Sequence, residues 1–454
     1  MTPTESAVTV MDNVTESPAL IVPTVQIPVP EAQVSETHNL RIFYLCCMKK
    51  TGISVEKLLD YIPDTVLEQI GDKTKVDYQV KRLHGKTVFH LLLYGLLTEK
   101  ELSLRVLEAL FDNIRFQTFA NLIDAKRTDH SSIGDRLNTI KVDYFESIFK
   151  QTSARLSAVY SPVELKHLKV VRFDATVIGI SSKLLKINGI VNGRKSKDKD
   201  KSRLNLKFTI GFDGLIPKEA VFQNAQVHVS DEIALGEVLT NVAVSADEIL
   251  VFDQGLSSRK RFGELNDQDK RFVTRTRGDL PVGTKHKKIE DVTEIEAGKE
   301  PQTETLTIFA DEKVYLYGDK GRKTTFPLRL IKAARRDTGV PIWLLTNIFD
   351  LSVEEITEIY RLRWEIELFF RFLKHEFGFT HLISRSENGI KIMLYMHMIA
   401  MMLIYIYRKL NNIKSFRIAK LKFVNELDKV ILKIIIQMCK GRPELLDLLH
   451  QLRV

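Results

Sequence analysis

Apolar residues recur at helical spacing through 38–165, as in the runs TVFHLLLYGLL and LSLRVLEALF. The pattern predicts a small all-helical domain over 38–165. Within it, the segment DHSSIGDRLNTI places Ser131 or Ser132 at the N-cap of a helix that carries Arg136. Two interpretations of this helix stay open. It is either a DNA-recognition helix that contacts DNA through Arg136 or an ordinary solvated helix face.

The pattern changes to short strand-like runs from about residue 168. The runs KVVRFDATVIGI, LNLKFTIGFDG and LIPKEAVFQN indicate an antiparallel meander, and EILVFD and RFVTRTRG indicate further strands. Residues 281–346 are again β-rich and interrupt what would otherwise be one strand-then-helix unit, so we expect an inserted β subdomain. After Asp350 the pattern is helical to the last residue.

These patterns predict an α/β protein. Its expected parts are a disordered tail at 1–37, a helical DNA-binding domain at 38–165, a divided α/β domain at 166–280 and 347–410, the β subdomain at 281–346, and a C-terminal helical region at 411–454. The tail holds five of the 13 prolines and no Lys or Arg, which favours disorder. The charged run 192–203 is expected to be a loop, either solvated or in contact with DNA.

The charge balance narrows the class of partner. The 454 residues carry a formal charge of +9, and the first 37 carry five acidic residues, so the remainder carries +9 + 5 = +14. A basic folded part favours a polyanion. The three cysteines, Cys46, Cys47 and Cys439, lack zinc-site spacing and fit a reducing cytoplasm.

The most apolar stretch, 392–407, falls short of the roughly 20 residues that span a bilayer, and it contains His397. We therefore expect a buried helix and no membrane partner. The start of the chain has no basic region followed by an apolar run, so secretion is not expected.

Three acidic residues stand in positions suited to metal chemistry. Asp174 lies inside a strand-like run, Asp253 ends another, and Glu367 lies in a predicted helix. Ser352 and Glu355 form a capping box, and no Pro or Gly follows before Gly378, which predicts one continuous helix. Each acid also has an ordinary interpretation: a solvent-facing strand residue, a turn aspartate, or a partner in a helical ion pair.

Tyr360, Arg363, Glu367 and Lys374 lie at offsets of 0, 3, 7 and 14, which places them on one stripe of that helix. Phosphodiester cleavage with two Mg²⁺ ions requires carboxylates beside phosphate-binding cations. Asp174, Asp253 and Glu367 are thus the candidate catalytic and metal-binding residues, with Mn²⁺ as a substitute for Mg²⁺. His228 and Asp231 either line this site or cap a helix.

The run from Tyr360 to Lys374 (YRLRWEIELFFRFLK) resembles the Y-R-E-K signature of bacterial insertion-sequence transposases of the DDE class, insertion-sequence family four. RFDATV and LVFDQG resemble the two aspartate blocks of that family. The resemblance implies a ribonuclease-H-like catalytic domain with an inserted β subdomain. It also implies that Tyr360, Arg363, Trp364 and Lys374 contact DNA. One difference is Gln254 after the second aspartate, where the family often has a basic residue.

The sequence therefore predicts a DNA transposase that binds insertion-sequence ends, cleaves phosphodiesters and transfers strands into target DNA. The expected partner is double-stranded DNA, with a homodimer on the DNA ends, in the bacterial cytoplasm and associated with the nucleoid. Two alternatives remain: a catalytically silent, transposase-derived DNA-binding protein, and another ribonuclease-H-like nuclease.

Overall fold

The computed structural model describes residues 52–122, 126–159, 168–180, 190–191, 204–213, 216–223, 226–276, 285–293, 303, 305–317, 324–378, 383–384 and 386–443. The predicted tail 1–37, the charged run 192–203, and Cys46 and Cys47 lie outside these residues.

Helices form the first described part of the chain, as the apolar spacing predicts. They are α2 (Val55–Leu59), α3 (Asp64–Thr74), α4 (Gly85–Thr98), α5 (Leu104–Phe111), α6 (Ile114–Phe119), α7 (His130–Thr139) and α8 (Val142–Val159). The N-cap of α7 is Asp129, which accepts a 2.8 Å bond from the Ser132 amide. The prediction of Ser131 or Ser132 as the cap was wrong, because the carboxylate one turn earlier reaches the free amides.

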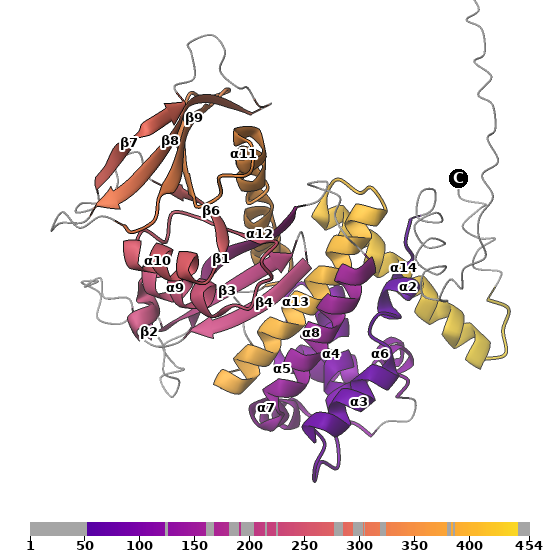
Figure 1. Cartoon of the computed structure of the whole chain (residues 1–454). Helices are drawn as coiled ribbons and strands as arrows, with labels where there is room; N and C mark the ends of the chain where they lie inside the picture. The colour runs from indigo at the N-terminus through magenta and orange to yellow at the C-terminus, as the bar shows by residue number, and fades with distance from the viewer. Residues whose placement is uncertain are drawn as a thin grey trace, which may run out of the picture. The chain divides into compact units, whose positions relative to one another are not determined.

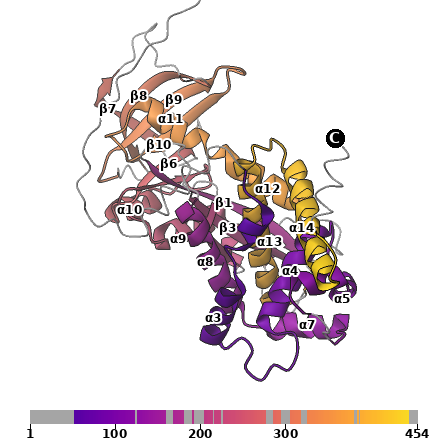
Figure 2. The same cartoon turned by 90° about the vertical axis from the view of Figure 1, so that its right-hand side faces the viewer.

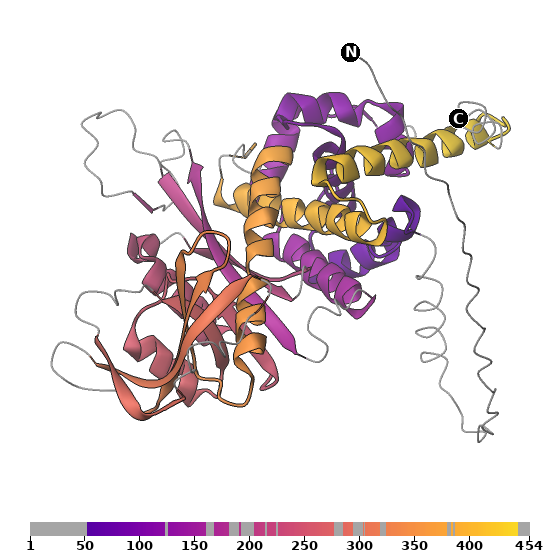
Figure 3. The same ribbon diagram turned by 90° about the horizontal axis from the view of Figure 1, so that it is seen from above.

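Two long C-terminal helices complete the core of this helical part. α13 (Glu387–Leu410) packs against α4, α7 and α8, and α14 (Phe416–Met438) packs against α2, α6 and α13 (Figure 1). The Asn388 amide donates to the carbonyls of Leu137 and Ile140 at 3.0 and 2.6 Å. Figure 3 shows α14 extending past its neighbours, and Ile434 and Met438 in its outer half are exposed.

α13 is the one helix among the described residues that is long and apolar enough to cross a membrane. However, 94% of its most apolar window is buried inside the protein. The two ring nitrogens of His397, near its centre, lie 2.6 and 2.9 Å from the carbonyl oxygens of Met393 and Phe377. The prediction of a buried helix at 392–407 is confirmed.

The remaining elements form a mixed sheet of ten strands. They are β1 (Lys169–Ile180), β2 (Ile190–Val191), β3 (Leu204–Asp213), β4 (Ile216–Gln223), β5 (Glu248–Phe252), β6 (Arg271–Thr276), β7 (Lys285–Thr293), β8 (Leu306–Tyr317), β9 (Leu328–Arg335) and β10 (Pro341–Thr346). The order is β2-β3-β1-β5-β6-β10-β9-β8-β7, with β4 on β3. β1, β3 and β4 are the expected antiparallel meander, and β5 and β6 pair in parallel beside β1.

The β-rich segment 281–346 contributes β7 to β10, and these strands continue the main sheet. β10 pairs antiparallel with β6, for example Leu345 with Thr274. Val314 and Leu328 in these strands share one buried cluster with Phe252 of β5. The segment is therefore an extension of the sheet with a shared core. The sequence predicts an inserted β subdomain at 281–346, and the four strands within this range join the main sheet through the pairing of β10 with β6.

Helices cover both faces of the sheet. On one face, α9 (Asp231–Asn241) and α10 (Arg259–Asp267) pack over β1, β5 and β6. On the other face, α11 (Val353–Arg361) packs over β5 and β6, and α12 (Trp364–Glu376) packs over β1 and β3 (Figure 1). The expected α/β class, with helices before and after the sheet, is confirmed.

The predicted continuous helix from Ser352 is two helices. The Ser352–Glu355 capping box is present, as expected. α11 ends at Arg361, and a turn at Leu362 and Arg363 precedes α12. The Arg363 amide bonds to the carbonyl of Tyr360 at 3.0 Å, three positions back, as in a tighter helical turn. This turn directs the Arg363 side chain inward, where only 8% of it is exposed.

Candidate active site

Strand pairing brings the two candidate aspartates together. β1 and β5 run parallel, and their last paired residues are Phe173 and Phe252. Asp174 and Asp253 each follow directly, so their backbones lie at the same level of the sheet. Side chains alternate along a strand, so Asp253 is on the same face as Val251, two residues earlier, which packs in one cluster with Ile359 of α11. Asp174, level with Asp253, is on that face too.

The turn between α11 and α12 supplies the other side chains. Tyr360 donates its hydroxyl hydrogen to Oδ1 of Asp253 at 3.1 Å. Arg363 donates from Nη2 to Oε1 of Glu367 at 2.5 Å, and its guanidinium carbon lies 5.5 Å from the centre of the Tyr360 ring. Tyr360 and Arg363 are both buried, and Glu367 is partly exposed.

The electrostatics show that the three carboxylates act on one another. The pKa of Asp174 is raised to about 6, mainly by burial and to a smaller extent by the charges of Asp253 and Glu367, although Arg363 and the Ala175 amide act to lower it. Burial alone would lower the pKa of Arg363, but Tyr360, Asp253 and Glu367 outweigh burial, so the pKa is raised. Burial likewise raises the pKa of Tyr360, which keeps its phenol protonated. The site thus combines three acids with one buried cation.

The donor set suits a hard divalent cation. Three carboxylates face a single guanidinium, which leaves an excess of negative charge, and carboxylate oxygens are the ligands that Mg²⁺ and Mn²⁺ take. Within the part of the chain that the structure describes, no three His, Cys, Asp or Glu side chains lie close enough to enclose a metal. Tyr360 and Arg363 instead hold Asp253 and Glu367 in separate pairs.

Trp364 and Lys374 lie on the exposed side of α12. The Trp364 side chain is 46% exposed, and the guanidinium of Arg371 lies 6.0 Å from its ring centre. Lys374 is exposed as well. These two residues therefore flank Glu367 on the solvent side of the helix.

Arg136 lies away from these acids, in the helical part of the chain. Its guanidinium bonds to the carbonyls of Leu83 and Val76, both at 3.0 Å, and to Asp77 at 3.2 Å. Those bonds use the Nε and Nη2 donors of Arg136 and hold the loop between α3 and α4. The geometry gives Arg136 a structural task, and we do not include it among the proposed DNA contacts.

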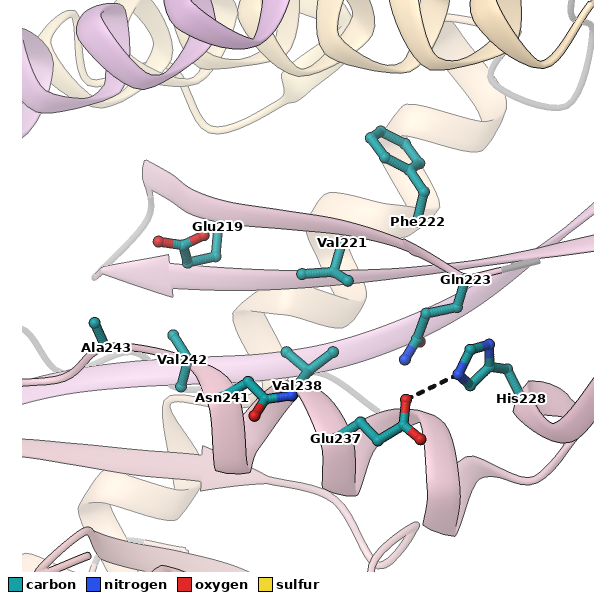
Figure 4. Close-up of a pocket in the computed structure, with 10 residues that line it drawn as sticks. All are labelled: Glu219, Val221, Phe222, Gln223, His228, Glu237, Val238, Asn241, Val242 and Ala243. Carbon is teal, nitrogen blue, oxygen red and sulfur yellow. Dashed lines mark hydrogen bonds and ion pairs between the residues drawn. The ribbon is translucent and has the colours of Figure 1, made fainter. Parts of the chain in front are cut away.

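His228 and Asp231 also lie outside the acidic site. The His228 ring bonds to Glu237 of α9 at 2.9 Å, beside a cavity of about 490 Å³ between β4 and α9 (Figure 4). Asp231 is the first residue of α9. Glu232, which the sequence did not single out, binds the amides of Ser257 and Ser258 at 2.7 and 2.9 Å. It thereby fixes the loop that follows Asp253.

Comparison with known proteins agrees with this architecture. A family model described as "Transposase DDE domain" matches residues 166–403, more than half of the chain, from the start of β1 through most of α13. A solved piggyBac transposase synaptic complex with hairpin DNA has 14% identity and a TM-score of 0.42, and the match covers 88% of this chain and 82% of that one.

Three curated relatives are similar over parts of the chain. A putative transposase of Sinorhizobium fredii is 27% identical over 38% of this chain and 46% of its own length. A probable transposase for insertion sequence element IS5377 of Geobacillus stearothermophilus is 27% identical over 37% of this chain and 41% of its own. A putative transposase for insertion sequence element IS4SA of Synechocystis is 23% identical over 69% of this chain and 89% of its own length.

The matched segments thus span less than half the length of the first two relatives. The family match covers the strands that carry both aspartates and the helix that carries Glu367. The strands and helices within the matched range form the expected mixed α/β fold. The chain belongs to the transposase family defined by the DDE domain.

Proposed function

We propose that this protein is a DNA transposase that binds insertion-sequence ends, cleaves phosphodiester bonds and transfers the freed strand into target DNA. The observation that carries the proposal is the placement of Asp174 and Asp253 at the same level of the adjacent parallel strands β1 and β5, within electrostatic range of Glu367 on α12.

Asp174, Asp253 and Glu367 would hold two divalent ions, Mg²⁺ or Mn²⁺. When bound, such ions neutralise the scissile phosphate and activate the attacking oxygen. The protein's own contribution is positioning. β1 and β5 fix the two aspartates side by side, and the Tyr360 hydroxyl orients Asp253. Glu367 follows Arg363 by one helical turn, which sets the third carboxylate above the strands.

The stripe on α11 and α12 supports DNA as the substrate. Arg363 provides a planar guanidinium suited to a phosphate, Lys374 an exposed ammonium, and Trp364 an exposed ring. With Tyr360, these residues match the Y-R-E-K signature, so we place the chain in that group of insertion-sequence transposases. We also propose that it acts as a homodimer on paired ends, in the bacterial cytoplasm and on the nucleoid.

Both alternatives are less well supported. A silent DNA-binding protein has no need of three convergent carboxylates. A general ribonuclease-H-like nuclease has no need of Trp364 and Lys374 exposed beside Glu367, or of the helical part that precedes the sheet.

The test uses the full chain and a labelled duplex that carries the inverted repeats flanking its gene. Site-specific nicking at the repeat in Mg²⁺, followed by joining to a target plasmid, is the expected result. Binding without nicking, in either Mg²⁺ or Mn²⁺, would favour the silent DNA-binding protein. Cleavage with equal efficiency on random duplex or on an RNA–DNA hybrid would favour the general nuclease.

A further inference from the structure

The loop between α3 and α4, residues 75–84, is basic and exposed. Its sequence is KVDYQVKRLH, and in Figure 2 it follows the indigo helix α3. The side chains of Lys75, Lys81 and Arg82 are exposed. Within the described residues, none of these three side chains forms an ion pair or a hydrogen bond. Tyr78 lies between them in the chain and is 73% exposed.

The backbone of this loop adopts an unusual conformation. Lys75, Gln79 and Leu83 have φ values of 50°, 59° and 54°, in the left-handed region, and none of them is a glycine. Each such residue costs about 1 kcal/mol or more, so three within nine positions require compensation from surrounding contacts. At Lys75 this conformation is the left-handed C-cap that ends α3, whereas Gln79 and Leu83 adopt it inside the connection itself.

Arg136 supplies much of that compensation. Its buried guanidinium bonds to the carbonyls of Leu83 and Val76 and to the carboxylate of Asp77. Asp77 also accepts a 2.7 Å bond from the amide of Gly85. The loop is thus anchored at its start, at Asp77 and at its end.

Packing and a second cation add to this anchoring. Val76 and Leu83 are buried in the helical core, at 3% and 8% exposure. Lys141, at the start of the helix that follows α7, donates to the carbonyl of Thr74 at 2.7 Å. The loop therefore has one defined conformation before any ligand arrives.

The anchoring also separates the charges. Asp77, the one acid between residues 75 and 84, is bonded to Arg136 through one carboxylate oxygen, and His84 lies 3.7 Å from the other oxygen; 36% of the Asp77 side chain is exposed. The cations of Lys75, Lys81 and Arg82 face solvent. The outer surface of the loop is therefore positive and unopposed by the carboxylate of its own sequence.

We infer that loop 75–84 is a preorganised contact for the phosphate backbone of duplex DNA, with Lys75, Lys81 and Arg82 as phosphate ligands and Arg136 as their positioning residue. The inference rests on the proposed function, and it assigns the DNA contact of the helical part to this loop instead of α7. A rigid cationic loop loses little conformational entropy on binding. Phosphate contacts of this kind fix the register of a protein on DNA without reading its sequence.

The experiment compares two triple variants of the full chain. Lys75→Gln/Lys81→Gln/Arg82→Gln neutralises the loop. Lys422→Gln/Lys429→Gln/Arg442→Gln removes the same charges from exposed positions on and just beyond α14. Binding to an end duplex and to a random duplex is measured by fluorescence anisotropy across salt concentrations. The loop variant should lose affinity on both duplexes, and its salt slope should fall by about 2 to 3, because each phosphate contact contributes about 0.9.

The α14 variant should keep the wild-type slope. Equal losses in both variants would mean that net charge alone matters, and a wild-type slope in the loop variant would remove the loop from the interface. Either result overturns the inference. Neither of these two results contradicts the proposed function if the wild-type protein still binds and nicks the end duplex. Failure of the wild type to bind any duplex overturns the proposed function itself.

Arg136→Met tests the positioning role. It removes no exposed charge, yet it should weaken binding because the loop loses its anchor. Thermal unfolding checks that the variant is folded. Tyr78→Ala is a second probe that leaves every anchor intact, and it should reduce affinity severalfold with an unchanged melting temperature. If Arg136→Met is folded and binds as the wild type does, the loop does not depend on this anchor for its contact.

Discussion

The hydroxyl of Tyr360 donates a 3.1 Å hydrogen bond to Asp253, joining residues 107 positions apart. The bond ties the end of α11 to the end of β5. Beside it, Arg363 is paired with Glu367, so two of the three carboxylates have a fixed partner before any ligand binds. Tyr360 and Arg363 therefore contact the acids directly, in addition to the DNA contact that we propose for them.

Replacement of Arg363 tests whether it neutralises the acids. Arg363→Met should destabilise the metal-free protein by about 2 kcal/mol, because Glu367 loses a charged hydrogen bond and the carboxylates repel one another. Addition of Mg²⁺ or Mn²⁺ should raise the melting temperature of the variant more than that of the wild type. Urea unfolding and thermal scans measure both effects. Arg371→Met, at an exposed position on α12, is the control. Similar metal responses in all three proteins would contradict the idea.

Metal ligation by the aspartates is tested by a change of ligand. Asp174→Cys and Asp253→Cys should abolish nicking in Mg²⁺ and recover part of it in Mn²⁺, because a thiolate is a poor ligand for hard Mg²⁺. Glu367→Gln should be nearly inactive while still binding ends. Nicking of a labelled duplex is followed in each metal, with end binding as the control. Normal cleavage by both Cys variants in Mg²⁺ would refute the assignment of the three acids.

Lys374 is exposed on α12 and is expected to contact one phosphate. Lys374→Ala should weaken binding to ends and lower the salt slope by about 1, because one fewer counterion is released. The fold should be unchanged. Anisotropy titrations at several salt concentrations measure the slope, with Lys422→Ala as the matched exposed control. A slope identical to that of the wild type would give Lys374 a role other than DNA contact.

Lys420 makes stability depend on pH. Burial lowers its pKa to about 8, although its ammonium donates to the Glu376 carbonyl at 2.9 Å and lies over the Phe377 ring. Between pH 8 and the ordinary lysine value of 10.5, the unfolded chain binds more protons than the folded one. The contribution of Lys420 to stability therefore rises with pH across that window, by about 2 to 3 kcal/mol.

Lys420→Met should remove that rise. Urea unfolding at pH 7 and at pH 10 gives the difference for wild type and variant, and the exposed Lys422→Met is the control. If wild type and Lys420→Met change equally between the two pH values, burial does not control this lysine.

The helical part should not fold alone. α13 and α14 fill its core, and Asn388, Glu426 and Asn411 bond to backbone groups of Leu137, Val55 and Ile53. A fragment of residues 52–159 should therefore give a weak helical signal and no cooperative melting, because it exposes the apolar surface that α13 covers. Circular dichroism measures this, with the full chain as reference. Cooperative unfolding of the fragment would show that the C-terminal helices are dispensable.

The sequence predicted the strands well because their apolar alternation and turn residues are local signals. β1, β3, β4, β5 and β6 all lie where the runs indicate. The proximity of Asp174 and Asp253 was suggested only by family resemblance, since it depends on the parallel pairing of β1 with β5, which neither run encodes alone. The sequence also gave no sign that β10 would extend the same sheet.

Three features were missed for physical reasons. No Gly or Pro marks the turn at Leu362 and Arg363 in the sequence. The turn places the buried Arg363 guanidinium among acidic side chains, and that interaction explains why the helix breaks here. α9 and α10 are short, and the charged sequence of α10 buries only Phe262 and Leu265. Arg136 has the sequence context of a surface cation, but its backbone partners lie 53 and 60 positions earlier in the chain.

The position of α13 within the helical core has a consequence for synthesis on the ribosome. α4, α7 and α8 leave the exit tunnel long before α13, which fills the space among them. A nascent chain that stops before residue 387 lacks the whole of α13 and so cannot complete that core. Asp174, Asp253 and Glu367 all precede residue 387, so they are translated before the core around α13 can form.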